Sequence, residues 1–191
     1  MGEAALLGVR SVNYEGAGTI EFIVDKNKNF YFIEMNTRIQ VEHPVTEMVR
    51  NFDLIKNQIL IAAGKPIEDL PKEPTGNAIE FRINAEDPDN NFRPSPGRIE
   101  YLHFPGGFGV RIDSHIYNEY VIPPYYDSLL AKLIIWGTNR KHAINRARRA
   151  LEEFKIEGVK TTIPFHQKVL ENEKFIEGDF DTSFIDKHFK N

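Results

Sequence analysis

The feature that most limits how this chain can fold is a pair of β-rich runs with a polar segment between them. The runs are Gly18–Val24 and Phe30–Asn36, and the segment Asp25–Asn29 that separates them is entirely polar. Such a pattern predicts an antiparallel hairpin. A hairpin that closes with Asp25 opposite Phe30 also forms these pairs: Ile23 with Phe32, Glu21 with Glu34, and Thr19 with Asn36.

The predicted register sets two carboxylates, those of Glu21 and Glu34, directly opposite each other on one face. Like charges in that position destabilise a sheet unless something positive lies between them. A Mg²⁺ ion fits the position, because it takes oxygen ligands and typically uses one or two carboxylates together with substrate phosphates. The amide oxygen of Asn36 would complete the set. Two other interpretations stay open: both glutamates are solvated on an exposed face, or the register is shifted by one residue.

Polar side chains also dominate the stretch from Glu34 to Glu42. If this stretch is extended, its side chains alternate between two faces. One face then carries five polar residues in succession: Glu34, Asn36, Arg38, Gln40 and Glu42. A solvated edge strand has this pattern, and so does a substrate channel that holds a metal, an anion and a general base. Arg38 favours the channel, because a guanidinium can clamp a planar oxyanion through two hydrogen bonds.

Along its length the chain is expected to contain the tail of one α/β domain (residues 1–64), a linker (65–76) and a complete α+β domain (77–191). The linker holds three prolines and several charges. The first part is expected to contain, besides the hairpin, a helix at Glu3–Val12, an extended stretch at Thr37–His43 that stops at Pro44, and a helix at Thr46–Ala63 with Gly64 as its C-cap.

The second part has a different sequence pattern, with strand-like runs between turns rich in proline and glycine. Strands are expected at Ala78–Asn84, Arg98–Phe104, Gly109–His115 and Ser128–Trp136, followed by two closing helices at Asn139–Phe154 and Pro164–Asn172. The first of these two helices contains many basic residues. A nucleic-acid surface is one interpretation, but its apolar face and the acidic Glu152 and Glu153 favour a solvated helix surface.

Composition excludes several classes of protein. The chain has no cysteine, so it has neither a disulfide framework nor a thiolate metal site. No apolar run has the length of a membrane span, and Met1–Arg10 lacks the layout of a signal peptide, which together predict a cytoplasmic protein without a membrane partner. The net charge of −4 argues against non-specific binding to nucleic acid.

Two segments, Gly16–Phe22 and Phe32–Glu47, closely resemble the C-terminal half of the ATP-grasp domain of biotin carboxylases. The run from Glu34 to Pro44, Glu-Met-Asn-Thr-Arg-Ile-Gln-Val-Glu-His-Pro, matches without a gap. Three later segments resemble the C-terminal domain of the same family: Phe92–Ile99, Pro105–Arg111 and Pro123–Leu129. The resemblance implies an α+β chain, in which the C-terminal part of an ATP-grasp domain precedes an antiparallel sheet with packed helices.

The resemblance also implies roles for the polar residues. Glu21, Glu34 and Asn36 would bind the Mg²⁺ (or Mn²⁺) ions that bridge the phosphates of ATP, so that both glutamates contribute to nucleotide binding. Arg38 would lie beside bicarbonate and Glu42 would be the general base. Gln40 and the backbone N–H of Val41 would hold bicarbonate. These roles agree with the polar face inferred from strand geometry.

In the second part the resemblance concerns Arg82. On their own, Glu80, Arg82 and Asn84 on one strand face are more typical of a structural salt-bridge network than of a site. The resemblance places Arg82 at the ureido oxygen of biotin, where it would stabilise developing negative charge. The glycine-rich segment 105–109 lacks the Lys-Ser/Thr of a phosphate-binding P-loop.

The family resemblance places Phe108 and Arg111 at a homodimer interface. Tyr126 and Asp127 would lie near the edge of the active site, with a packing role equally open. The implied substrates are ATP and bicarbonate. The implied partner is a biotin carboxyl carrier protein, which presents the biotin cofactor.

The implied function is the ATP- and bicarbonate-dependent carboxylation of biotin, the first half-reaction of acetyl-CoA carboxylase in fatty acid synthesis. Family members also carry an N-terminal domain, a glycine-rich lid and lysines that contact ATP, and the present sequence lacks counterparts to them, which predicts an inactive fragment. Three alternatives stay open. The chain could belong to another ATP-grasp ligase such as a carbamoyl-phosphate synthase, to a pyruvate or propionyl-CoA carboxylase, or to a non-catalytic dimerisation module.

Overall fold

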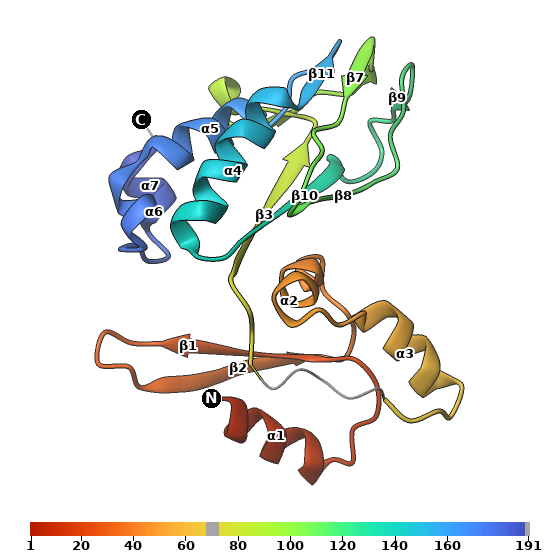
Figure 1. Cartoon of the computed structure of the whole chain (residues 1–191), viewed down its shortest axis with the longest axis vertical. Helices are drawn as coiled ribbons and strands as arrows, with labels where there is room; N and C mark the ends of the chain where they lie inside the picture. Colours follow the sequence, from red (N-terminus) through yellow and green to blue (C-terminus); the bar gives the residue numbers. More distant parts are fainter. Residues whose placement is uncertain (68–72, 190–191) are drawn as a thin grey trace. The chain divides into compact units, whose positions relative to one another are not determined.

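The computed structural model describes residues 1–67 and 73–189 and divides into two units, Met1–Pro74 and Thr75–Asn191 (Figure 1). Part of the expected linker, residues 68–72, lies outside the described residues, as do the last two positions of the chain. Within the described ranges, no helix combines the length and apolar character that crossing a bilayer requires.

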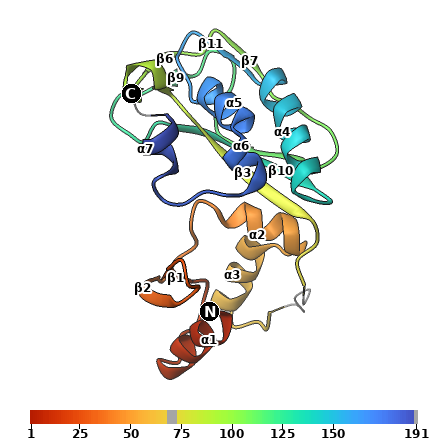
Figure 2. The ribbon, with the colours of Figure 1, turned by 90° about the vertical axis from the view of Figure 1, so that its left-hand side faces the viewer.

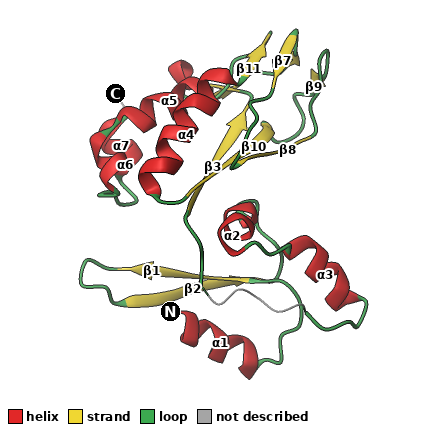
Figure 3. Ribbon diagram, in the orientation of Figure 1, coloured by secondary structure: helices red, strands yellow, loops and turns green. Residues whose placement is uncertain are grey.

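The first unit places a β-hairpin among helices (Figure 3). Its elements are α1 (Gly2–Ser11), β1 (Thr19–Val24), β2 (Phe30–Asn36), α2 (His43–Arg50) and α3 (Leu54–Ala62). Asp25 closes the hairpin, because its Oδ1 accepts hydrogen bonds from the amides of Asn27 and Asn29 at 2.8 and 2.9 Å. A side-chain hydrogen bond from Asn29 holds the pKa of the Asp25 carboxyl below its usual value.

The predicted hairpin register is confirmed at the open end of the hairpin and wrong at its turn. Glu21 pairs with Glu34 and Thr19 with Asn36, as expected. Nearer the turn, the pairs are instead Phe22 with Phe32, Ile23 with Tyr31, and Val24 with Phe30. A β-bulge causes the difference, because Ile33 is an additional residue in β2 and shifts the remaining pairs by one.

The expected extended stretch is shorter than predicted. Strand β2 ends at Asn36, the chain bends at Thr37 and Arg38, and α2 begins at His43. Pro44 therefore lies in the first turn of a helix, where its missing N–H breaks no helical hydrogen bond.

The single helix predicted from Thr46 to Ala63 is two helices. Asn51 adopts a left-handed conformation (φ 49°) and ends α2, and Asp53 caps α3 by accepting a hydrogen bond from Lys56 N at 2.7 Å. The expected C-cap at Gly64 is confirmed. Gly64 has φ 71°, and the amides of Gly64 and Lys65 bond to the carbonyls of Ile61 and Leu60, which is the Schellman pattern.

The second unit is built on a three-stranded antiparallel sheet in the order β3 (Asn77–Asn84), β10 (Leu129–Gly137) and β8 (Val110–Ser114). The helices α4 (Arg140–Glu153) and α5 (Ile163–Glu171) lie along one face of this sheet (Figure 1). The core between them consists of apolar residues with little or no exposure, among them Phe81, Ile83, Leu133, Ile135, Ala147, Leu151, Phe154 and Leu170. The predicted apolar face of α4 is therefore confirmed.

Short strand pairs extend the second unit beyond the main sheet. They are β4 (Glu86–Asp87) with β5 (Arg93–Pro94), β6 (Gly97–Arg98) with β9 (Val121–Ile122), and β7 (Tyr101–His103) with β11 (Lys155–Glu157). The single strand expected at Arg98–Phe104 is thus divided between β6 and β7. Figure 2 shows β6, β7, β9 and β11 gathered at one end of the unit. A second core of Ala85, Ile99, Ile116, Ile122 and Leu130 packs there.

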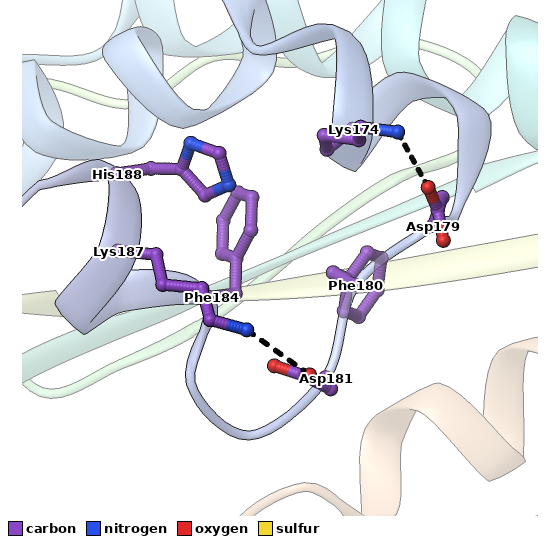
Figure 4. Close-up of a pocket in the computed structure, with 7 residues that line it drawn as sticks. All are labelled: Lys174, Asp179, Phe180, Asp181, Phe184, Lys187 and His188. Atoms are coloured by element: carbon purple, nitrogen blue, oxygen red, sulfur yellow. Dashed lines mark hydrogen bonds and ion pairs between the residues drawn. The ribbon is translucent and has the colours of Figure 1, made fainter. Parts of the chain in front are cut away.

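Two short helices after α5, α6 (Glu173–Glu177) and α7 (Phe184–His188), were not predicted. Five residues are too few for a helical period to show in a sequence. Aromatic rings hold this end together, with Phe175 stacked on Phe180 at 5.5 Å and Arg140 over Phe175 at 4.9 Å. Two exposed ion pairs, Lys174–Asp179 and Lys187–Asp181, flank the shallow pocket beside these rings (Figure 4).

The interpretation of α4 as a solvated basic surface is wrong for three of its arginines, Arg140, Arg146 and Arg148, which are partly buried, whereas Arg149 is exposed. All four donate to a backbone carbonyl of another segment. Arg140 bonds to the carbonyls of Phe175 and Ile176, Arg146 to Trp136, Arg148 to Leu170 at 2.7 Å, and Arg149 to Gly106 at 3.0 Å. A helical wheel cannot reveal this use, because the acceptors belong to distant segments.

Gly109 is the position where this arrangement most requires glycine. Its φ is +74°, and a Cβ there would lie 2.7 Å from the carbonyl oxygen of Trp136 and against the Arg146 guanidinium. A Cβ at Gly106 would meet nothing within 4 Å.

We therefore expect Gly109→Ala to lower the free energy of unfolding by about 1–3 kcal/mol. Gly106→Ala should change it by less than about 0.5 kcal/mol. Chemical denaturation followed through Trp136 fluorescence measures both. Equal effects of the two substitutions would contradict the assigned contact.

Candidate active site

Two carboxylates face each other across the hairpin, and an amide lies between them. Glu21 and Glu34 are directly paired in the register. Asn36 Nδ2 donates to Glu21 Oε1 and to Glu34 Oε1, both at 3.0 Å. The amide hydrogens thus occupy the position where the sequence predicts a cation, and they reduce the repulsion between the two acids.

These three side chains fit a divalent cation that also binds phosphate. Rotation of the Asn36 amide by 180° would exchange its donor for an acceptor oxygen, which gives three oxygen ligands on one face. Mg²⁺ commonly takes one or two carboxylates and completes its shell with water and phosphate oxygens. In the described part of the chain no cluster of three or more His, Cys, Asp or Glu side chains has metal-binding geometry.

Gln40 joins this group although the chain is not extended there. Its Nε2 donates to Glu21 Oε1 at 2.8 Å. The turn that brings it back is held by His43, whose N and Nδ1 lie 3.2 and 2.8 Å from the carbonyl oxygen of Gln40. The same-face placement of Glu34, Asn36 and Gln40 was predicted from strand alternation, whereas the structure achieves it with a strand end followed by a turn.

Glu47 stabilises the segment that follows this turn, a role that the sequence did not predict. It is only 9% exposed. Its Oε1 accepts a hydrogen bond from Leu54 N, the first residue of α3, at 2.7 Å, and its Oε2 lies 3.9 Å from His43 Nε2. One carboxylate thus links the start of α2 to the start of α3. The only available signal was the i, i+4 spacing of His43 and Glu47.

Arg38 lies at the end of the hairpin beside a pocket of the first unit. Its Nη2 donates to Asn36 Oδ1 at 3.4 Å and its Nη1 to the carbonyl of Ile39 at 3.2 Å. The pocket, of about 530 Å³, is lined by Arg38 and by residues that sequence reasoning did not single out, including Tyr14, Glu15 and Gln58. Arg38 is thus within reach of both the carboxylate pair and an open space.

The remaining candidates of the first unit, Val41 and Glu42, form the turn immediately before α2. Both are exposed, and Glu42 occupies the N-cap position of α2. The positive end of the helix dipole favours a negative charge at that place. The structure therefore brings Glu21, Glu34, Asn36, Arg38 and Gln40 into one hydrogen-bonded group, with Val41 and Glu42 in the adjoining turn.

Arg82 belongs to the second unit, on β3. Its neighbours Phe81 and Ile83 point into the core, so Arg82 projects from the opposite face. Its side chain is 51% exposed and its Nε lies 3.8 Å from Glu80 Oε1. The expected salt bridge on this strand face is present, and about half of the Arg82 side-chain surface remains accessible. Asn84 turns instead to Glu86, with its Nδ2 3.1 Å from Oε1.

The residues expected at a dimer contact differ in exposure. Phe108 is 79% exposed, with one edge against Trp136 at 5.8 Å. Arg111 forms two 2.8 Å hydrogen bonds to Asp113 of its own chain. Near the expected edge of the active site, Tyr126 is exposed, while Asp127 Oδ1 accepts a hydrogen bond from Leu129 N at 2.7 Å.

Family comparison decides what kind of protein carries this group. Residues 80–187 match the family model of the biotin carboxylase C-terminal domain. Residues 1–70 match that of the carbamoyl-phosphate synthase L chain ATP-binding domain. The chain belongs to the biotin carboxylase family. Its fold is accordingly a part of an ATP-grasp domain followed by the biotin carboxylase C-terminal domain, as the resemblance implied.

Relatives in this family match nearly the whole chain. The biotin carboxylase of a Nostoc species is 58% identical over 97% of the chain and 42% of its own length. A pyruvate carboxylase subunit from Methanothermobacter thermautotrophicus is 52% identical over 98% of the chain and 38% of its own length. The chain therefore spans about two fifths of these biotin carboxylase relatives.

A solved biotin carboxylase structure has the same fold. The biotin carboxylase domain dimer of Hydrogenobacter thermophilus 2-oxoglutarate carboxylase, in complex with MgADP, ADP and bicarbonate, superposes with a TM-score of 0.95 at 48% identity. The match covers 98% of this chain and 42% of that one.

The buried link through Glu47 gives a testable consequence. Glu47→Ala removes the acceptor of the Leu54 amide, and a lost hydrogen bond of this kind is worth about 1–3 kcal/mol. We expect hydrogen exchange of the Leu54 amide, measured by NMR, to accelerate about 10-fold or more. Glu47→Gln, which keeps an acceptor oxygen, should have a smaller effect.

Asp53→Ala is the matched control, because Asp53 caps the same helix through a different amide, that of Lys56. This change should release the Lys56 amide more than the Leu54 amide. Faster exchange at both amides in both variants would mean that α3 frays as a whole.

Proposed function

We propose that this chain supplies the metal, bicarbonate and biotin residues of a biotin carboxylase, which acts together with the N-terminal region that its relatives carry. The observation that carries the proposal is the hydrogen-bonded group of Glu21, Glu34, Asn36, Arg38 and Gln40. It combines facing carboxylates with a guanidinium and amides, which suits a metal-bound nucleotide beside a small oxyanion.

In the proposed reaction, ATP phosphorylates bicarbonate to carboxyphosphate and releases ADP. Carboxyphosphate then yields CO₂ and phosphate beside a deprotonated biotin nitrogen, which attacks the CO₂. When bound, the Mg²⁺ or Mn²⁺ held by Glu21, Glu34 and Asn36 would neutralise phosphate charge. Arg38, Gln40 and the N–H of Val41 orient bicarbonate. Glu42 takes the proton of the biotin nitrogen, directly or through the released phosphate.

Arg82 is assigned to the biotin ring. Its half-exposed side chain projects from a strand whose other face is buried in the core. A fixed cation of this kind stabilises negative charge that develops on the ureido oxygen when the ring nitrogen loses its proton.

We also propose a division into domains. Residues 1–64 would be the ATP-grasp part, 65–76 a linker and 77–191 the biotin carboxylase C-terminal domain, and the family-model matches at 1–70 and 80–187 support this division. On the first unit, apolar side chains of the hairpin such as Ile23, Phe30 and Phe32 are exposed. We propose that they pack against the N-terminal region that completes the ATP-grasp domain in relatives.

We propose that the chain is part of an acetyl-CoA carboxylase. Its partner would be a separate biotin carboxyl carrier protein, and its location would be cytoplasmic. The Nostoc relative, which is named simply as a biotin carboxylase, favours this choice. Relatives named for pyruvate and 2-oxoglutarate carboxylases are nearly as similar. A carboxylase of a 2-oxo acid is therefore the second candidate, and the acceptor that becomes carboxylated by the purified complex distinguishes them.

Activity can be measured in a chimera in which the N-terminal region of the Nostoc relative precedes this chain. From the chimera we expect bicarbonate-dependent ATP hydrolysis that biotin stimulates, and from the chain alone none, because phosphoryl transfer depends on positioning the phosphates. ATP hydrolysis that biotin does not stimulate would favour another ATP-grasp ligase.

In the same chimera Glu42→Gln should lower the biotin-dependent rate by about 100-fold or more, as expected for loss of a general base. Arg38→Ala should cost about 100-fold, since it removes a charge-stabilising donor. Glu3→Gln, in the exposed first turn of α1, is the control. Near-normal activity of Glu42→Gln would remove the assignment of the base.

A homodimer through the region of Phe108 and Arg111 is also proposed, since the solved Hydrogenobacter domain is a dimer. In sedimentation velocity, the chimera should behave as a dimer and Phe108→Ser should shift it toward monomer. Tyr125→Ser, at an 86% exposed aromatic outside the expected contact, should not. A strictly monomeric chimera at micromolar concentration would contradict the interface.

A further inference from the structure

The strand that carries Arg82 has one edge that pairs with no strand of the described sheet. In the order β3-β10-β8, β3 bonds to β10 on one side, where Arg82 lies opposite Lys132. Edge strands leave backbone groups unpaired and are free to shift unless something covers them. Here the start of α5 covers the edge.

Thr162, the N-cap residue of α5, bonds to this edge through its backbone and its side chain. Thr162 N donates to the carbonyl of Asn84 at 3.1 Å. Its hydroxyl accepts from Asn84 N at 3.0 Å and donates to the carbonyl oxygen of Arg82 at 2.9 Å. One hydroxyl thus uses both its donor and its acceptor capacity on two alternate residues of β3.

His166 reaches the same carbonyl from one helical turn further on. Its Nε2 lies 2.9 Å from the carbonyl oxygen of Arg82. A carbonyl can only accept, so Nε2 carries the hydrogen. The ring packs edge-on against Phe81 at 5.4 Å, which fixes its orientation. Burial lowers the pKa of His166, so the ring is neutral near pH 7 and its single N–H is committed to this bond.

We propose that Thr162 and His166 are positioning residues for Arg82. They hold the peptide of Arg82 from the open edge while β10 holds it from the other side, and so they fix the point from which the guanidinium reaches its ligand. A long side chain that is half exposed keeps considerable rotamer freedom of its own. Movement of its Cα would add to that freedom, and small displacements of a charge-stabilising group reduce a rate strongly.

The proposal rests on the proposed function in one respect, the assignment of Arg82 to biotin. The hydrogen bonds themselves join residues about eighty positions apart. Their contribution concerns Arg82 alone, because the residues assigned to metal and bicarbonate belong to the other unit.

This separation defines the test. In the chimera, Thr162→Val and His166→Leu should each lower kcat/KM for free biotin by about 10-fold or more. Bicarbonate-dependent ATP hydrolysis without biotin should stay within about 2-fold, because it does not use Arg82. His166→Gln, whose amide N–H can take the place of Nε2–H, and Thr162→Ser should recover most of the biotin-dependent rate.

Gln167→Leu is the matched control, since Gln167 also donates from α5 to a backbone carbonyl, that of Leu151 at 3.2 Å. It should leave both activities unchanged. The proposal is overturned if His166→Leu and His166→Gln behave alike, or if ATP hydrolysis falls together with the biotin-dependent rate, which indicates a general loss of structure.

A second measurement separates this proposal from the proposed function. NMR relaxation of the Arg82 Nε–H group can be recorded on the present chain, without any substrate. His166→Leu and Thr162→Val should increase its motion and Gln167→Leu should not. If the wild-type chimera lacks biotin-dependent activity, the proposed function is wrong, whereas unchanged Arg82 relaxation in both variants overturns the positioning role by itself.

Discussion

The repulsion between the paired carboxylates of Glu21 and Glu34 is the constraint around which the candidate site of the first unit is arranged. Two like charges opposite each other in a hairpin are unfavourable unless donors or a cation offset them. The amide of Asn36 bonds to both acids, and Gln40 adds a further donor to Glu21. The strand end, the following turn and the start of α2 therefore have a common role, which is to bring donors to two acids that the hairpin register has placed together.

Much of this arrangement could be predicted from the sequence, because strand alternation and pairing are periodic. The Glu21–Glu34 and Thr19–Asn36 pairs follow from the lengths of two runs and the turn between them. The bulge at Ile33 could not be predicted, since a bulge leaves no periodic signal. The break between α2 and α3 could not be predicted either. It depends on a left-handed Asn51 and a cap at Asp53 within a run whose apolar spacing continues as if one helix spanned it.

The arginines of α4 show a second limit of sequence reasoning. Their spacing on the helix resembles that of a solvated basic face, and the apolar face opposite them was predicted correctly. What the pattern omits is the identity of the acceptors, which are carbonyls of the glycine-rich segment, of β10 and of the helices after α4. Because guanidinium groups carry several donors in a fixed geometry, they can bond to carbonyls of segments that lie far away in the sequence. Such contacts are determined by tertiary structure alone.

Each unit contains a histidine that holds the backbone of a candidate site residue. In the first unit His43 holds the carbonyl of Gln40, and in the second His166 holds the carbonyl of Arg82. In both cases a ring nitrogen bonds to the backbone of a residue whose side chain is assigned to substrate, and not to that side chain itself. Fixing the backbone in this way keeps constant the point from which the functional amide or guanidinium extends.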